Sequence, residues 1–138
     1  MSHYAVLDED NNVIEVFYAG DENDTSTLPS EFSSWEEFYS DLKDKTCLRT
    51  SYNTYEGEHK QGGTPFRGNY ASIGGVYDVD ADIFLGQKNW ESWIKDIDNF
   101  GWKPPLEKPN DTDDWLWDEE LYQSDNTQGW IPLPTPPE

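Results

Sequence analysis

The chain contains few cysteines and histidines, and this scarcity excludes several classes of site. Its 138 residues include one cysteine and two histidines. Cys47 has no second cysteine with which to form an intramolecular disulfide, and a chain of this length can bury enough surface to fold without one. With only His3 and His59 beside it, a zinc site built from four Cys or His ligands is excluded. We therefore expect no structural metal and a protein made in a reducing cytoplasm.

Basic residues and long apolar runs are also scarce. Nine lysines and arginines stand against 29 acidic residues, which gives a formal net charge of −20. DNA, RNA and anionic membranes each require a basic patch, so we expect none of them as a partner. No stretch approaches the ~20 apolar residues of a membrane span. Residues 1–18 lack the basic start and apolar run of a secretion signal, so we expect a soluble protein that is not exported by the usual route.

Aromatic residues, by contrast, are abundant. The chain has seven Trp, eight Tyr and six Phe. High charge with low hydropathy is typical of disorder, but each aromatic side chain can bury on the order of 150–250 Å². Leu, Ile and Val are sparse. We therefore predict a folded protein whose thin core is built mainly from aromatic side chains.

Four segments repeat one pattern, in which an apolar or aromatic run meets an acidic turn and is followed by a second apolar run. This pattern is typical of hairpins with aromatic cross-strand pairs. The segments cover residues 4–17, 76–84 and 93–102, and a fourth begins at 115–117 and continues at either 121–122 or 130–131. Residues 46–52 also favour an extended conformation.

One helix is predicted at about residues 33–44, because Trp35, Phe38, Tyr39 and Leu42 recur at the spacing of one buried helix face. Proline in residues 103–114 and 132–138 excludes these segments from a sheet interior. The predicted fold class is therefore mainly β (α+β): a small antiparallel sheet or hairpin array with one short helix and extended Pro-rich straps. We expect a single domain over 1–131, with a strap at about 103–114. We expect residues 132–138 to be a C-terminal arm, and the sequence leaves open whether this arm docks on a neighbour or is disordered.

The sequence offers little support for catalysis. Neither histidine has the local spacing of a nucleophile system, and Cys47 in a predicted strand is by default an inert, buried thiol. Asp78, Asp80 and Asp82 share the spacing of a calcium loop, but Ile83 and Asn89 occupy the positions that require Gly and Glu. This favours a solvated hairpin turn. The glycine pairs match no nucleotide-binding motif. We predict no catalytic residues, no metal and no cofactor, and therefore a protein that is not an enzyme.

Aromatic side chains and one arginine are the candidates for contacts with a partner. Arg67 has Phe66 and Tyr70 nearby, in a segment where acidic residues are few, and Arg and Tyr are common interface anchors. An alternative is that Arg67 pairs with an internal acid and stacks on a ring. The predicted partner-binding residues are Tyr52, Phe66, Arg67, Tyr70, Trp102 and Trp130, of which the last two precede prolines.

Several motifs resemble those of one protein family. The most specific is Gly-Gly-Thr-Pro-Phe-Arg at residues 62–67, and further matching stretches lie at 2–5, 13–14, 50–54, 68–71, 73–74, 77–78, 82–84, 92–93, 102–105, 117–119 and 130. The pattern resembles a family of small virion structural proteins of tailed bacteriophages, most of them marine phages that infect cyanobacteria and similar hosts. The chain differs from the family pattern at Glu56-Gly57 and at residues 85–89. The resemblance implies a structural part of a virion.

Combined with the charge, the resemblance favours a capsid decoration or cement protein on the outside of the head, since an acidic surface repels packaged DNA. Its partners would be other virion proteins, first among them the major capsid protein, and self-association on the particle stays open. Alternatives are a tail- or fibre-associated protein and an acidic mimic of DNA that inhibits a host protein. An enzyme acting on surface glycans has the least support. The predicted location is the virion, assembled in the host cytoplasm.

Overall fold

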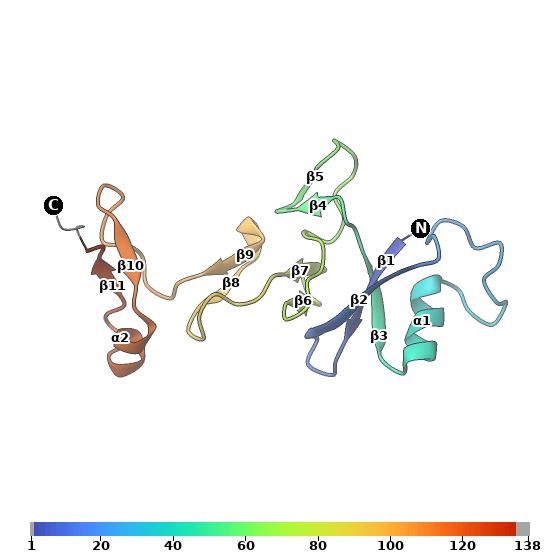
Figure 1. Ribbon diagram of the computed structural model, residues 1–138, viewed down its shortest axis with the longest axis horizontal. Coiled ribbons are helices and arrows are strands. Elements are labelled where there is room, and N and C mark those ends of the chain that lie inside the picture. The colour runs from blue at the N-terminus through green and yellow to red at the C-terminus, as the bar shows by residue number, and fades with distance from the viewer. Residues whose placement is uncertain (1, 135–138) are drawn as a thin grey trace. The chain divides into compact units, whose positions relative to one another are not determined.

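The computed structural model describes residues 2–134, and its strands form small antiparallel sheets (Figure 1). This confirms the predicted mainly β fold class. The chain divides into two compact units, which we describe separately. The first unit comprises Met1–Gln87 and Asp96–Gly101, and the second comprises Lys88–Lys95 and Trp102–Glu138. The single domain over 1–131 stays a prediction, because a compact unit is not by itself a domain that folds alone.

A three-stranded sheet organises the first unit. Strand β1 (Ser2–Leu7) lies between β2 (Val13–Ala19) and β3 (Thr46–Thr50), and both neighbours are antiparallel to it. The β1–β2 turn forms because the Asp8 carboxylate accepts hydrogen bonds from the backbone N–H groups of Asp10 and Asn12, both at 2.9 Å. This is the first predicted hairpin.

Helix α1 (Trp35–Lys43) begins and ends on clear local signals. The Ser34 side chain accepts a hydrogen bond from the Glu37 N–H at 3.1 Å, and Asp44 ends the helix in a left-handed conformation. The helix at about 33–44 is thus confirmed. Its predicted buried face is wrong at Leu42, which is 65% exposed. The ring–ring contacts of α1 among the described residues come from Trp35, Phe38 and Tyr39, so its aromatic packing lies in the first two turns and does not include Leu42.

The edge of the sheet at β3 is covered by side chains of α1, which packs beside this strand (Figure 1). Ser40 Oγ accepts from the Cys47 N–H at 2.8 Å, and Glu36 Oε2 accepts from the Arg49 N–H at 2.7 Å. Glu36 and Ser40 are one helical turn apart, so they face the same strand. The outward N–H groups of β3 are therefore paired within the chain and do not form an open edge.

Three further pairs of strands follow in the chain. They are β4 (Thr54–Tyr55) with β5 (Glu58–His59), β6 (Val76–Asp78) with β7 (Ile83–Leu85), and β8 (Ile94–Asp96) with β9 (Gly101–Lys103), the last two joined by a 3-10 helix at Ile97–Asn99. The second and third predicted hairpins are thus confirmed. The β6–β7 hairpin is attached to β2, because Val13 donates to the Gly75 carbonyl at 2.9 Å.

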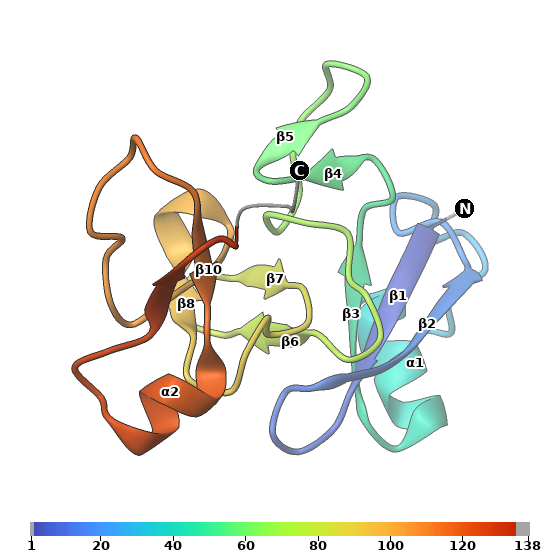
Figure 2. The ribbon, with the colours of Figure 1, turned by 60° about the vertical axis from the view of Figure 1, so that its left-hand side comes forward.

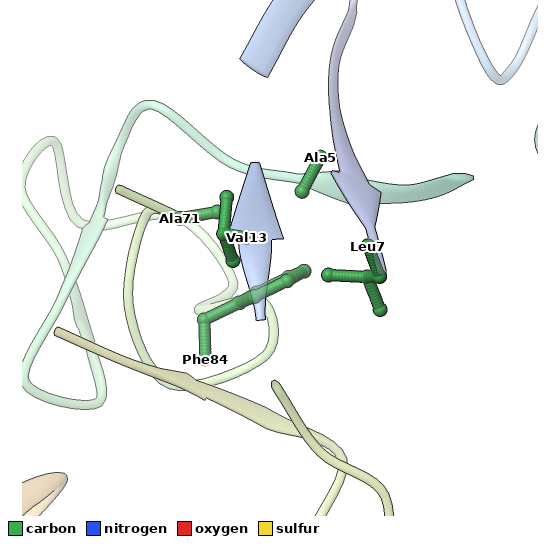
Figure 3. Packing of buried hydrophobic residues seen from close by; sticks show 5 residues of the cluster. All are labelled: Ala5, Leu7, Val13, Ala71 and Phe84. Atoms are coloured by element: carbon green, nitrogen blue, oxygen red, sulfur yellow. The ribbon is translucent and has the colours of Figure 1, made fainter. Parts of the chain in front are cut away.

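The central core of the first unit is small and largely aliphatic. Figure 3 shows its members Ala5, Leu7, Val13, Ala71 and Phe84, which come from β1, β2, β7 and the segment before β6. The prediction of a mainly aromatic core is wrong. Among the described residues, the buried aromatic side chains are those of Tyr4, Trp35, Phe84 and Trp117. The other rings of the first unit are half-buried or exposed.

The second unit is built on a two-stranded ribbon. The chain leaves β10 (Trp115–Trp117), forms α2 (Glu119–Ser124) and returns as β11 (Trp130–Pro132), as Figure 2 shows. Of the two alternatives for the fourth hairpin, the strand at 130–131 is therefore correct. Residues 121–122 belong to α2, so the prediction of only one helix is wrong. The Asp118 side chain accepts from the Leu121 N–H at 3.0 Å and starts this helix.

The Pro-rich segments lie mostly outside helices and strands where they are described, although Lys103 ends β9. Between β9 and β10 the chain has neither helix nor strand. In the predicted arm at 132–138, Pro132 ends β11, and residues 135–138 lie outside the described part of the chain.

Candidate interaction surfaces

The six predicted contact residues lie in three different places. Phe66 and Arg67 belong to a network of charges in the first unit, Tyr52 and Tyr70 to a cluster of rings in the same unit, and Trp102 and Trp130 to the second unit. The sequence does not predict this separation, because residues 66, 67 and 70 are close neighbours along the chain.

Arg67 lies in a network of internal hydrogen bonds and ion pairs. Its Nη1 atom donates to Glu36 Oε2 and to the Arg49 carbonyl oxygen, both at 2.8 Å, and its Nε atom donates to Asp82 Oδ1 at 2.9 Å. Burial acts to lower the pKa of Arg67, but the hydrogen bond and charge of Glu36 outweigh it and raise that pKa. The side chain is only 15% exposed. Of the two alternatives for Arg67, internal pairing is therefore the one that the structure contains.

The half-buried Phe66 ring contacts two guanidinium groups. The Cζ atoms of Arg49 and Arg67 both lie 4.8 Å from the ring centroid. The Arg49 Nε atom is buried and has no hydrogen-bond partner among the described residues, so the ring is its compensating contact. Phe66 thus helps to hold β3 against the segment that carries Arg67.

Four aromatic side chains form a second group, which we call the tyrosine cluster: His3, Tyr18, Tyr52 and Tyr70. The His3 ring centroid lies 4.8 Å from that of Tyr18, 5.8 Å from that of Tyr52 and 5.4 Å from that of Tyr70. His3 is half-buried, whereas Tyr18 is 59% and Tyr52 60% exposed. Burial lowers the pKa of His3 and favours the neutral imidazole. The cluster is therefore an exposed, neutral aromatic surface.

A hollow of about 240 Å³ lies beside the tyrosine cluster. It is lined by the cluster residues His3, Tyr18 and Tyr52 together with small polar residues and Arg49; the others are Ser2, Thr50, Ser51 and Asn53. None of its lining residues is acidic, although the chain carries 29 acidic residues. The lining of the hollow itself therefore carries no negatively charged side chain.

The ribbon of the second unit has one face covered by aromatic side chains. Trp117 and Trp130 are directly opposite each other on β10 and β11, and their ring centroids are 5.2 Å apart in an edge-to-face arrangement. Tyr122 from α2 and Trp93 also contact Trp117, at 5.4 and 6.3 Å. The Trp130 Nε1 atom donates to the Leu106 carbonyl at 2.8 Å, so the Pro-rich strap is fastened to the ribbon.

A carboxylate secures this aromatic face. Glu119 accepts hydrogen bonds from the Ser92 hydroxyl at 2.5 Å, from Trp117 Nε1 at 2.9 Å and from the Gln123 amide at 2.7 Å. The bond from Ser92, helped by those from Trp117 and Gln123, lowers the pKa of Glu119 to about 2. Glu119 therefore stays ionised at neutral pH and ties α2 to the segment that contains Ser92.

The opposite face of the ribbon is apolar and exposed. Leu116 pairs with Ile131 next to the Trp117–Trp130 pair, and successive side chains of a strand point to opposite faces. Leu133 continues this face, because its N–H donates to the Asp114 carbonyl at 3.0 Å and extends the ladder. Leu116 is 45% and Leu133 50% exposed. We call Leu116, Ile131 and Leu133 the ribbon face.

The residues of the ribbon face and two members of the tyrosine cluster were missed from sequence. Alternation in Trp115-Leu116-Trp117 was a usable signal, since Leu116 must point away from both tryptophans. The position of Tyr18 beside His3 follows from the register of the first hairpin. That Tyr52 and Tyr70 join them depends on contacts between distant parts of the chain, and no local pattern indicates it.

Neither a cluster of metal ligands nor a membrane-spanning helix is found among the described residues. Within residues 2–134, no three His, Cys, Asp or Glu side chains are grouped so that they could hold a metal ion. Cys47 is buried, and burial raises the pKa of its thiol. Neither helix in the described part of the chain has the length and apolar character needed to cross a bilayer.

No protein-family model matches this chain, and no curated protein or solved structure is significantly similar to it. The resemblance to small virion proteins of tailed phages is therefore a prediction from the sequence motifs.

Proposed function

We propose that this chain is a structural protein of a tailed-phage virion, and that it decorates the outside of the head through contact with another virion protein, first the major capsid protein. The observation that carries the proposal is the ribbon face. Its three apolar side chains lie in a row on one face of a small ribbon, Leu116 and Leu133 are exposed, and an exposed apolar surface of this kind suits a protein–protein contact.

The residues around the ribbon face support a contact of this kind. Trp117 and Trp130 pack against each other on the opposite face of the ribbon and stabilise it. A partner would therefore meet a preformed surface and lose little conformational entropy on binding. Trp130, one of the predicted contact residues, is half-buried on this ribbon, and Trp102 is half-buried in the same unit. We therefore assign the contact with the virion to the second unit, and treat Phe66 and Arg67 as residues that stabilise the first.

The net charge of −20 supports the outside of the head over its interior. Packaged DNA would repel such a protein, whereas a surface that faces water accommodates it. Several acidic side chains bind their own loops: Asp8 accepts from Asn12, Asp24 from Ser26 and Asp125 from Thr127. This argues against the DNA-mimic alternative, which requires carboxylates spaced along one face like phosphates.

Mass spectrometry of purified particles tests the proposal. We expect peptides of this chain at a fixed copy number per particle, and their absence would overturn the virion assignment. Imaging of the particle then distinguishes the head surface from the tail or fibre, which is the alternative location.

A further inference from the structure

We propose that the hollow beside the tyrosine cluster binds a single neutral sugar ring. This site is separate from the ribbon face and its existence does not depend on the proposed virion function. Four features of the hollow carry the inference: its free polar groups, its exposed rings, its lack of acidic lining residues and its size.

Some polar groups of the hollow are already hydrogen-bonded within the chain, and others are available to a ligand. Ser2 Oγ and Thr50 Oγ1 are occupied, because they accept hydrogen bonds from the Glu22 and Ala71 N–H groups at 3.1 and 2.7 Å. The Tyr18 and Tyr52 hydroxyls and the Asn53 side-chain amide have no hydrogen-bond partner among the described residues. The hollow therefore presents donors and acceptors together, as a sugar with several hydroxyl groups requires.

The two exposed tyrosine rings add apolar surface that is held in place. Within residues 2–134, Tyr18 makes a ring contact only with His3, and 59% of Tyr18 is exposed, so the ring face away from His3 is accessible. Tyr52 is positioned by His3 and by Lys60, whose Nζ atom lies 3.6 Å from the ring centroid. The apolar C–H face of a pyranose can stack on such a ring while its hydroxyls reach the polar groups.

Charge and size narrow the class of ligand. A chain with a net charge of −20 repels an anionic sugar at long range, while Arg49 in the lining and Lys60 on Tyr52 oppose a cation. The volume of about 240 Å³ is below that of pockets for drug-sized ligands, which hold roughly 300–1,000 Å³. A neutral monosaccharide, or one terminal residue of a glycan, satisfies both conditions. Because the site is shallow, we expect a dissociation constant on the order of 1 mM.

Saturation-transfer NMR on the isolated full-length protein tests this site. The probes are D-glucose, D-galactose, D-mannose and N-acetyl-D-glucosamine, each added separately at millimolar concentration. We expect at least one of them to receive saturation and to shift the backbone amide signals of Tyr18, Tyr52 and Asn53. The variant Y18A should weaken that binding about tenfold, because it removes the accessible ring face.

The matched control is Y55A, which removes a tyrosine that is 69% exposed on β4 and does not line the hollow. It should bind the sugar as the parent does. A dispersed amide spectrum shows that each variant is folded, and N53A serves as a second test if Y18A does not fold. The proposal is overturned if none of the four sugars binds, if only an anionic sugar such as N-acetylneuraminic acid does, or if binding survives in both Y18A and N53A. Failure here leaves the virion proposal intact, since that one is decided on purified particles.

Discussion

At the scale of single residues, Arg67 stabilises the first unit. The variant R67M keeps most of the side-chain volume but leaves Glu36 and Asp82 without their ion pairs. Exposed pairs contribute roughly 0–1 kcal/mol, whereas breaking a buried one costs roughly 3–5 kcal/mol. Since the Arg67–Glu36 pair is partly buried, we expect R67M to lower the free energy of unfolding by about 2 kcal/mol. Urea unfolding measures this as a lower midpoint with an unchanged slope.

Lys43 provides a matched control for Arg67. Its Nζ atom pairs with Glu15 at 3.0 Å, and both side chains are much more exposed than that of Arg67. The variant K43M should therefore change the unfolding free energy by less than about 1 kcal/mol. Equal losses in K43M and R67M would contradict a structural role for the Arg67 network.

The lowered pKa of Glu119 predicts how the stability of the second unit changes in acid. Because its pKa in the folded state, about 2, lies below its ordinary value of 4.5, ionised Glu119 stabilises the fold above about pH 4.5. This contribution is lost as the pH falls from there towards about 2. We expect E119Q to be less stable than the parent at neutral pH, with a difference that shrinks through this acid range. Tryptophan fluorescence during urea unfolding measures it, because all but one tryptophan lie in the second unit.

The neighbouring Glu120 serves as the comparison for Glu119. The Glu120 side chain is exposed and makes no hydrogen bond within the described residues. E120Q should follow the parent at each pH. If E119Q and the parent differ by a constant amount from pH 7 to pH 2, the Ser92–Glu119 contact does not control acid stability.

At the scale of elements, the contact of α1 with the edge of β3 yields a prediction in which two effects oppose each other. Replacing Ser40 with alanine favours the helix slightly, because alanine has the higher helix propensity. It also leaves the Cys47 N–H without its partner, which costs about 1–3 kcal/mol when the group stays shielded from water. We expect a net loss of about 1 kcal/mol and faster hydrogen exchange at Cys47. A neutral or stabilising effect would mean that water replaces the serine hydroxyl.

The elements themselves were partly predictable from local sequence. The hairpins could be predicted, because an aromatic or β-branched run, an acidic turn and a second run encode both strands and their pairing. Helix α2 was missed because Leu121 and Tyr122 were one of two alternatives for the second strand of the fourth hairpin. Its start signals were present, with Asp118 as the cap and two glutamates in the first turn. Internal pairing of Arg67 was one of two alternatives, but its partners and those in the tyrosine cluster could not be predicted, since contacts such as Arg67 with Glu36 join residues that are distant in the sequence.

At the scale of the whole molecule, the aromatic residues are sorted between the two units. The first unit holds seven of the eight tyrosines and all six phenylalanines, whereas the second holds six of the seven tryptophans. Tyrosine suits the first unit, where exposed rings with free hydroxyls border the hollow. Tryptophan suits the second, where a thin ribbon needs large rings to bury any apolar surface. This division favours different roles for the units, a ligand site in one and a protein contact in the other.

The proposed attachment to the particle through the second unit can be tested with a pair of leucines. The variant L116D places a carboxylate in the ribbon face, and fully burying a leucine contributes roughly 1.5–3 kcal/mol to a contact. Attachment should therefore weaken by at least about tenfold. The control L42D makes the same change at the exposed Leu42 of α1, so its effect on net charge is identical. Quantitative mass spectrometry of particles assembled with each variant measures the copies bound. Loss with L116D and retention with L42D would locate the contact on the ribbon, whereas equal retention of both variants would exclude the ribbon face as the site of attachment.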